Sequence, residues 1–130
     1  MAQRDVGTVL DLWGRLAEGG SGALAGLEST DLDVNLVRFA AGAGVAPHVN
    51  PEVDVLLVVL AGEGVLTLDG VEHPLAAGTA LIIPKGVERG VRSTPDGSIA
   101  YLTVHRRRGR LWPTPRLRTP GAGSPDSPAT

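Results

Sequence analysis

From about Asp33 onward, the chain consists of short apolar runs separated by turns that contain glycine. These runs are VNLVRFA (34–40), VLLVVLAG (55–62), GVLTLDG (64–70), TALIIPKG (79–86) and IAYLTVH (99–105). Short runs at regular spacing predict the strands of an all-β barrel or sandwich. Leu68-Asp69-Gly70-Val71 is also a hairpin signal, because Asp-Gly favours a type I′ turn. Only 3% of the 130 residues are aromatic, so branched aliphatic side chains have to build the core.

The two ends of the chain have a different pattern. Residues 6–18 carry apolar side chains at helical spacing, which predicts a short amphipathic helix with Asp5 as N-cap and Gly19-Gly20 as its stop. Trp13 is expected to anchor this helix in the core, and 21–26 to form a loop. Residues 112–130 hold five of the ten prolines and predict a disordered tail. The expected organisation is therefore 1–28 (helix and loop), 29–111 (β-barrel) and 112–130 (tail).

Charge and composition exclude several function classes. Residues 1–105 carry six Lys/Arg and thirteen Asp/Glu, and residues 106–130 carry six Arg and one Asp. An acidic domain is a poor nucleic-acid binder, so the basic stretch HRRRGR (105–110) is interpreted as a solvated strand exit, with acids of a second subunit as its suggested partners. The absence of cysteine excludes disulfides and thiolate chemistry. No apolar stretch predicts a membrane span or a signal peptide, so we expect a soluble, cytoplasmic protein with neither nucleic acid nor membrane as partner.

Glycine and proline recur at fixed spacing in two motifs. The first has Gly42, five residues, His48-x-Asn50, then Asp54 after three residues or Val55 after four, then Gly62. The second has Gly78, five residues, Pro84-x-Gly86, two residues, Arg89, three residues, Ser93. In these motifs residues 33–106 resemble the cupin superfamily. The resemblance implies a small jelly-roll β-barrel.

The positions that bind metal in that family are mostly substituted. The family uses two His and a Glu from the first motif and a His from the second, and of these only His48 is kept. Asn50 is a poor ligand for a transition metal, and the guanidinium of Arg89 cannot bind a cation. The alternation of side chains along a strand does not decide whether Asp54 or Val55 faces inward. We therefore favour no metal cofactor.

Two further histidines complete the inventory. His73 follows the Asp-Gly turn and is expected at the surface, and His105 is expected at the barrel rim. A divalent transition metal stays an alternative only at a rearranged site. That site would draw on His48, on Asp54 or Glu52, and on His105.

The resemblance places His48, Asn50 and Arg89 in the barrel interior. An apolar cup with a few convergent polar groups is suited to a small molecule. Arg89 offers a donor fork for a carboxylate, phosphate or enolate oxygen, and His48 could move a proton if Asp54 orients it. The residues expected to bind the ligand are His48, Asn50, Leu57, Arg89 and His105.

The residues of this predicted pocket are compatible with three functions. We favour a binding module for a small, anionic organic molecule. The first alternative is a metal-independent isomerase, epimerase or cyclase, which resembles the chemistry that metal-free cupins perform on sugars and polyketides. The second is a metal-dependent, dioxygenase-like enzyme. In a fourth, purely structural interpretation, Arg89 pairs with Glu88, Glu52 or Asp54 and fills a former metal cavity.

We also expect a homodimer, with the strand at VNLVRFA buried by a partner or by the N-terminal helix.

Overall fold

The computed structural model describes residues 3–6 and 9–107. It contains one short helix and nine strands within these residues. Their bounds are β1 (Gln3–Val6), α1 (Leu12–Ala17), β2 (Gly22–Glu28), β3 (Leu32–Phe39), β4 (Gly44–Val49), β5 (Val55–Leu68), β6 (Val71–Ala76), β7 (Ala80–Ile83), β8 (Glu88–Ser93) and β9 (Ile99–Arg106).

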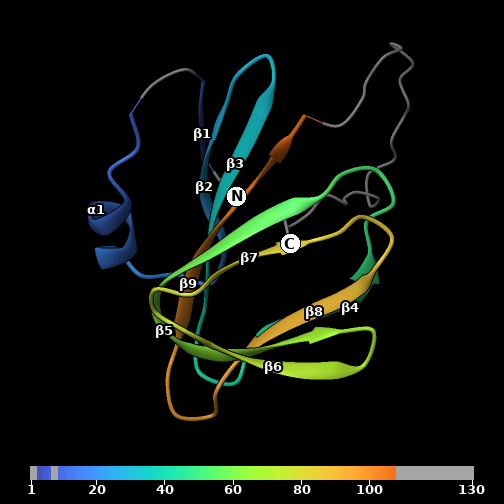
Figure 1. Ribbon diagram of the computed structural model, residues 1–130. Coiled ribbons are helices and arrows are strands. Elements are labelled where there is room, and N and C mark those ends of the chain that lie inside the picture. Colours follow the sequence, from blue (N-terminus) through green and yellow to red (C-terminus); the bar gives the residue numbers. More distant parts are fainter. Residues whose placement is uncertain (1–2, 7–8, 108–130) are drawn as a thin grey trace.

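The strands form two curled sheets that share β5. The first sheet has the order β1-β2-β3-β9-β5-β7, and the second has the order β6-β5-β8-β4. All pairings except β1 with β2 are antiparallel. Figure 1 shows the two sheets facing each other, with β4, β6 and β8 opposite β3 and β9. The predicted jelly-roll barrel is confirmed.

Strand β5 is continuous where the sequence suggested two strands with a turn at 62–64. Its first half pairs with β7 and β9, and its second half pairs with β6 and β8. The change of sheet occurs at Gly62, which has φ +81° and follows a register shift between Val59 and Ala61. A glycine and a bulge allow one strand to bend from one sheet into the other. The interpretation of 62–64 as a turn between separate strands was therefore wrong.

The Asp-Gly hairpin is confirmed. Asp69 and Gly70 both have positive φ (48° and 84°) and join β5 to β6, as a type I′ turn requires. His73 lies on β6 and is exposed, as expected. The apolar runs did not mark β4, β6 and β8, because these strands carry exposed or polar side chains at most positions or a proline.

The N-terminal region differs most from the prediction. The helix spans only Leu12–Ala17, and its N-cap is Asp11, whose carboxylate accepts a hydrogen bond from the Gly14 amide at 3.1 Å. Asp5, the predicted N-cap, instead lies in β1. Trp13 is 61% exposed and is not a core anchor. The prediction that 21–26 form a loop was also wrong, since they belong almost entirely to β2.

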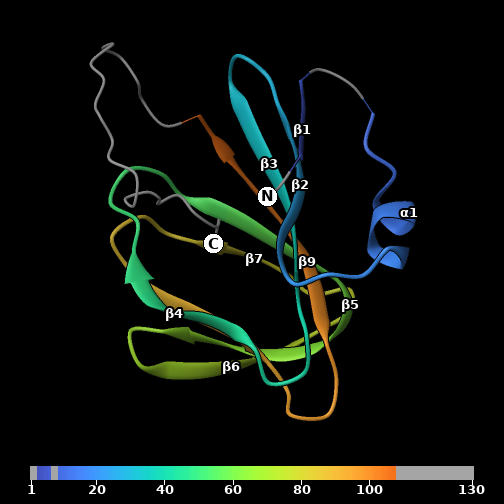
Figure 2. The same cartoon turned by 180° about the vertical axis from the view of Figure 1, so that it is seen from behind.

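Strand β2 also changes the account of the sheet edge. The stretch VNLVRFA lies in β3, which pairs with β2 on one side and with β9 on the other. The expectation that a second subunit or the N-terminal helix covers this edge was therefore wrong, because the chain covers it with its own strand. Figure 2 shows α1 on the side of the first sheet that faces away from β4 and β6.

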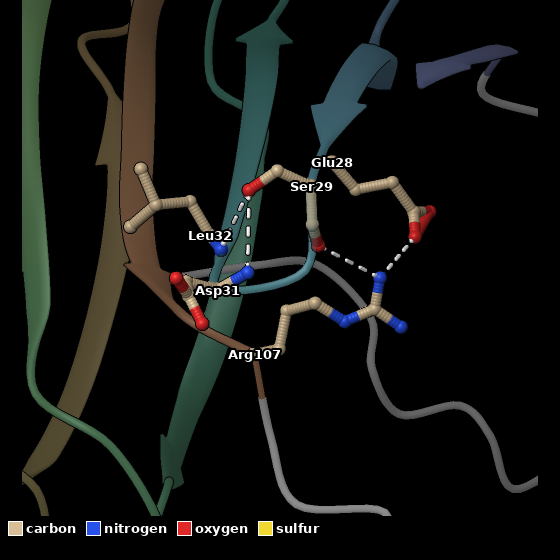
Figure 3. Close-up of polar contacts among 5 residues, drawn as sticks. All are labelled: Glu28, Ser29, Asp31, Leu32 and Arg107. Carbon is tan, nitrogen blue, oxygen red and sulfur yellow. Dashed lines mark hydrogen bonds and ion pairs between the residues drawn. The ribbon is translucent and has the colours of Figure 1, made fainter. Parts of the chain in front are cut away.

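The basic stretch at the end of β9 forms contacts within the chain. Arg107 donates to the Glu28 carboxylate at 2.7 Å and to the Ser29 carbonyl at 3.3 Å (Figure 3). Arg106 donates to the Glu52 carbonyl at 3.0 Å. These contacts hold the end of β9 against the loops that contain Ser29 and Glu52. The two arginines were suggested to pair with acids of a second subunit, and they have partners in the same chain instead. Residues 108–110 and the predicted tail at 112–130 lie outside the described residues.

Candidate functional site

The guanidinium of Arg89 is buried on the inner wall of the second sheet. Arg89 is 0% exposed, while its neighbour Glu88 is exposed and Val91, two residues on, belongs to the hydrophobic core. Because side chains alternate along a strand, Arg89 and Val91 share the face that points into the barrel. Its cross-strand partner on β5 is Leu68, which packs against the same core. A permanent cation therefore lies within an apolar wall.

His48 lies beside Arg89 because of a bulge in β4. The register between β4 and β8 pairs Val45 with Val91 and His48 with Arg89, so β4 contains one extra residue. This bulge, at Ala46-Pro47, lets both Val45 and His48 take inward positions. His48 is half-buried, and its Nδ1 lies 3.1 Å from the Ala46 carbonyl oxygen. A carbonyl oxygen only accepts, so Nδ1 is the donor in this contact.

Asn50 and Asp54 hold the loop between β4 and β5. The Asn50 side-chain oxygen accepts hydrogen bonds from the amides of Glu52 (3.0 Å) and Val53 (3.4 Å), as in an Asx turn. Asp54 is exposed, and its carboxylate accepts from the Lys85 amide at 2.9 Å. Val55, which is 1% exposed, is the residue that faces the core. The structure therefore settles the inward position in favour of Val55.

This geometry gives Asp54 a structural role. Replacing it with Ala should lower the free energy of unfolding by about 1 kcal/mol, because the Lys85 amide loses its acceptor. Binding of a barrel ligand should change by less than about twofold, since the two sites share no partner. Chemical denaturation and calorimetric titration measure the two effects, and Asp54→Asn, which keeps an acceptor oxygen, is the matched control. A large loss of binding with unchanged stability would return Asp54 to the site.

Three polar side chains of the first sheet lie on the inner face, two of them not predicted by the sequence analysis. Asn35 (7% exposed) and Thr103 (0%) are cross-strand partners, and Thr103 also pairs with the core residue Leu57. The Thr103 hydroxyl has no hydrogen-bond partner among residues 3–6 and 9–107. His105 is 7% exposed, so it is buried rather than exposed at the rim, and its Nδ1 contacts the Arg106 carbonyl at 2.8 Å. The signal for Asn35 and Thr103 was a polar residue at an inward position of an otherwise apolar run.

A groove of about 270 Å³ is lined by residues of β4, β5 and β8. Its outward-facing wall includes Thr67, Gly90 and Arg92, and the bulge at Ala46-Pro47 forms its edge. Thr67 donates to the Gly90 carbonyl at 3.4 Å, and Arg92 pairs with Glu72 at 3.0 Å. Thr67 and Arg92 thus already have partners in the chain, and we regard the inner wall as the better candidate site.

The fold is a small jelly-roll barrel whose inner wall carries several buried polar side chains. The chain belongs to the cupin family, because residues 35–105 match the model of the cupin domain. It is 36% identical over 67 residues to dimethylsulfoniopropionate lyase DddW of Ruegeria pomeroyi, covering 52% of this chain and 43% of the relative. It is 38% identical over 93 residues to Protein SchB of Streptomyces halstedii, covering 72% and 64%. The chain therefore spans less than two thirds of either curated relative.

Solved structures agree with this assignment. A cupin protein from Bacteroides fragilis is 29% identical with a TM-score of 0.58, covering 66% of this chain and 74% of that protein. TT1209 from Thermus thermophilus has a TM-score of 0.66 at 24% identity, covering 78% and 98%. The second likeness shows the fold alone.

The family's metal positions do not fit a metal in this chain. They are occupied by His48, Asn50, Val55 and Arg89. The Asn50 oxygen serves two backbone amides, Val55 has no donor atom, and the buried guanidinium of Arg89 would repel a cation. Nor does the described part of the chain gather three His, Asp or Glu side chains at a rearranged site. Glu52 and Asp54, both suggested for that site, are exposed.

Proposed function

We propose that this cupin binds a short organic anion inside the barrel without a metal, and that Arg89 contacts the anionic group. The observation that carries the proposal is the complete burial of Arg89 on the inner wall, opposite His48. A guanidinium holds a carboxylate or phosphate through parallel hydrogen bonds, and these are stronger where water is excluded. Arg89 stands at the position of a metal-binding histidine in the family, so its positive charge takes the place of a residue that would hold a cationic metal. It offers a ligand oxygen the same sign of charge.

One comparison guides the choice of ligand class. The relative DddW is named for a lyase reaction on dimethylsulfoniopropionate, and a propionate carries a carboxylate. A short carboxylate is therefore the first ligand class to test.

The test is a matched panel of acids and amides. Succinate, propionate and inorganic phosphate are titrated into the full chain, alongside succinamide and propionamide. We expect at least one acid to raise the melting temperature and to bind in calorimetry, because binding to the native state stabilises it. The uncharged amides should bind at least about tenfold more weakly, since they lack the charge that Arg89 recognises. Equal binding of acids and amides, or no binding of any acid, would overturn the proposal.

A second candidate is metal-independent proton-transfer chemistry on the same ligand. His48 is the cross-strand partner of Arg89, and its Nδ1 donates to the Ala46 carbonyl. This contact assigns the role of base to Nε2. In this scheme Nε2 takes a proton from the carbon next to the carboxylate, and Arg89 stabilises the resulting enolate oxygen. Incubating bound acids in D₂O and observing the carbon-bound proton by NMR tests this. Exchange that disappears in His48→Gln, with binding retained, supports it, and no exchange in the native chain contradicts it.

We also propose a homodimer, formed by the outer face of the first sheet. That face presents two rows of apolar side chains, including Val34, Leu56, Val58, Leu102 and Val104, next to the 56% exposed Ile82. Helix α1, which carries the 61% exposed Trp13, lies on the same side of the sheet (Figures 1 and 2). The five residues are only partly buried within one chain, and apolar side chains gathered on one face are typical of an interaction site.

The dimer has a direct test in the mass measured by light scattering. The native chain should have twice the mass of one chain at about 20 µM, a concentration at which a standard-sized interface of micromolar Kd is mostly assembled. Ile82→Lys combined with Trp13→Lys should shift it to the mass of one chain. Val71→Lys places a lysine on an equally exposed valine (58%) of β6 and should have no effect. A monomeric native chain would refute the proposal.

A further inference from the structure

The Thr103 hydroxyl is an unexplained polar group on the inner wall. The side chain is 0% exposed, and its oxygen has no hydrogen-bond partner within the described parts of the chain. A buried hydroxyl without a partner destabilises a fold, and valine would fill the same space without that cost. The threonine is therefore poorly explained by packing. It is well explained by a polar atom that arrives with a ligand.

The position of Thr103 relates it to the proposed anion site. Thr103 lies on β9 in the first sheet, and Arg89 lies on β8 in the second sheet. Both side chains are on inward faces, so they project from the two walls toward the space between the sheets. Facing sheets are about 10 Å apart, so a molecule that contacts both walls is short. Asn35, the cross-strand partner of Thr103, adds an amide to the same wall.

We infer that Thr103 determines specificity by hydrogen-bonding a second oxygen of the ligand, so that the preferred ligands are short hydroxy or keto carboxylates. This inference rests on the proposed function, in which Arg89 contacts the carboxylate. The two contacts have different chemistry. Arg89 recognises charge, whereas the hydroxyl of Thr103 donates to a keto oxygen or exchanges hydrogen bonds with a hydroxyl. A ligand that lacks the second oxygen leaves the buried hydroxyl unsatisfied and binds more weakly.

The experiment compares pairs of acids that differ by one oxygen. Calorimetry gives the Kd values of malate against succinate and of lactate against propionate, for the native chain and for Thr103→Val. We expect the native chain to bind the hydroxy acid of at least one pair about tenfold more tightly. In Thr103→Val the ratio should fall to within about twofold, with the affinity for the plain acid unchanged. The melting temperature of the ligand-free variant should be equal or higher, because a buried unsatisfied hydroxyl is removed.

Thr67→Val is the matched control, because Thr67 lies on the outward side of β5 and bonds the Gly90 carbonyl. The ratio of the Kd values of plain acid and hydroxy acid should be the same in Thr67→Val as in the native chain. A native chain that binds the acids of each pair equally, or a preference that survives Thr103→Val, would overturn the inference and leave the proposed function standing. Failure of all four acids to bind would overturn both, and binding that survives Arg89→Met would overturn the role of Arg89 alone.

Discussion

Replacing Arg89 with Met should abolish anion binding while leaving the fold intact. We expect the affinity for the best acid to fall by at least about 100-fold, because each hydrogen bond to a charged group contributes about 1.5–3 kcal/mol. The variant should stay folded, because methionine fills much of the volume of the side chain that it replaces, and its free energy of unfolding is measured separately from binding. Calorimetry and urea denaturation measure the two effects on the same samples.

Arg92→Met is the control, because Arg92 is three residues along the same strand, faces outward and pairs with Glu72. Its anion binding should match that of the native chain. The account predicts that Arg89→Met loses anion binding and stays folded. A fall in unfolding free energy of about 3 kcal/mol or more in Arg89→Met, with no anion bound by the native chain, would show that Arg89 is part of a buried structural pair.

Gly62→Ala should produce the largest loss of stability among the glycine variants. Gly62 has φ +81°, and a Cβ there would lie 2.0 Å from the Ser98 carbonyl oxygen, so the backbone where β5 changes sheets would have to move. A left-handed conformation costs a non-glycine residue about 1–3 kcal/mol, and the overlap adds to it, so we expect a total of about 3 kcal/mol or more. Urea denaturation monitored by circular dichroism gives the value.

Two other glycines separate the effect of the left-handed backbone from the effect of the overlap with Ser98. Gly78 has φ +93° but open space around its Cβ, so Gly78→Ala should show the backbone effect alone, about 1–2 kcal/mol. Gly97 has neither restriction, and Gly97→Ala should be neutral within about 0.5 kcal/mol. Equal losses at Gly62 and Gly78 would mean that the approach to Ser98 does not constrain the bend.

The strands that the sequence predicted are those with two apolar faces or a strong turn signal. Runs such as VLLVVLAG and IAYLTVH are apolar at nearly every position. One face of each strand lines the core, and the other belongs to the outer face of the first sheet, which is also apolar. The Asp69-Gly70 turn was predicted because few dipeptides favour positive φ at both positions. Strands β4 and β6 lack such signals. Each contains a proline and exposes most of its side chains.

The N-terminal region was misread because its short segments are ambiguous. Apolar residues in 6–18 fit a helix, but the chain forms only six helical residues after the Asp11 cap. The stretch GALAGLE is rich in glycine and alanine, which are weak strand formers, and it is a strand because it pairs with β3 along most of its length. Tertiary pairing overrides local propensity here, and a single sequence does not display it.

The candidate site was predictable by position and less so by role. The family resemblance implied that His48 and Arg89 both lie in the barrel interior, and in the structure they are cross-strand partners. The spacing left Asp54 and Val55 as alternatives because they are adjacent in the chain. The hydrogen bond from the Lys85 amide, which comes from another strand connection, turns Asp54 outward. The roles of Asn35, Asn50 and Thr103 depend on burial and partners, which spacing does not encode.

The central claim is that the barrel binds an organic anion without a metal, and one titration tests it most directly. Protein treated with chelator is titrated with its best acid, first without metal and then with one equivalent of Zn²⁺, Mn²⁺ or Fe²⁺. We expect the same Kd within about twofold in every case, because Arg89 supplies the positive charge. Binding that appears only after a metal is added would contradict the account and indicate that a metal supplies the anion contact.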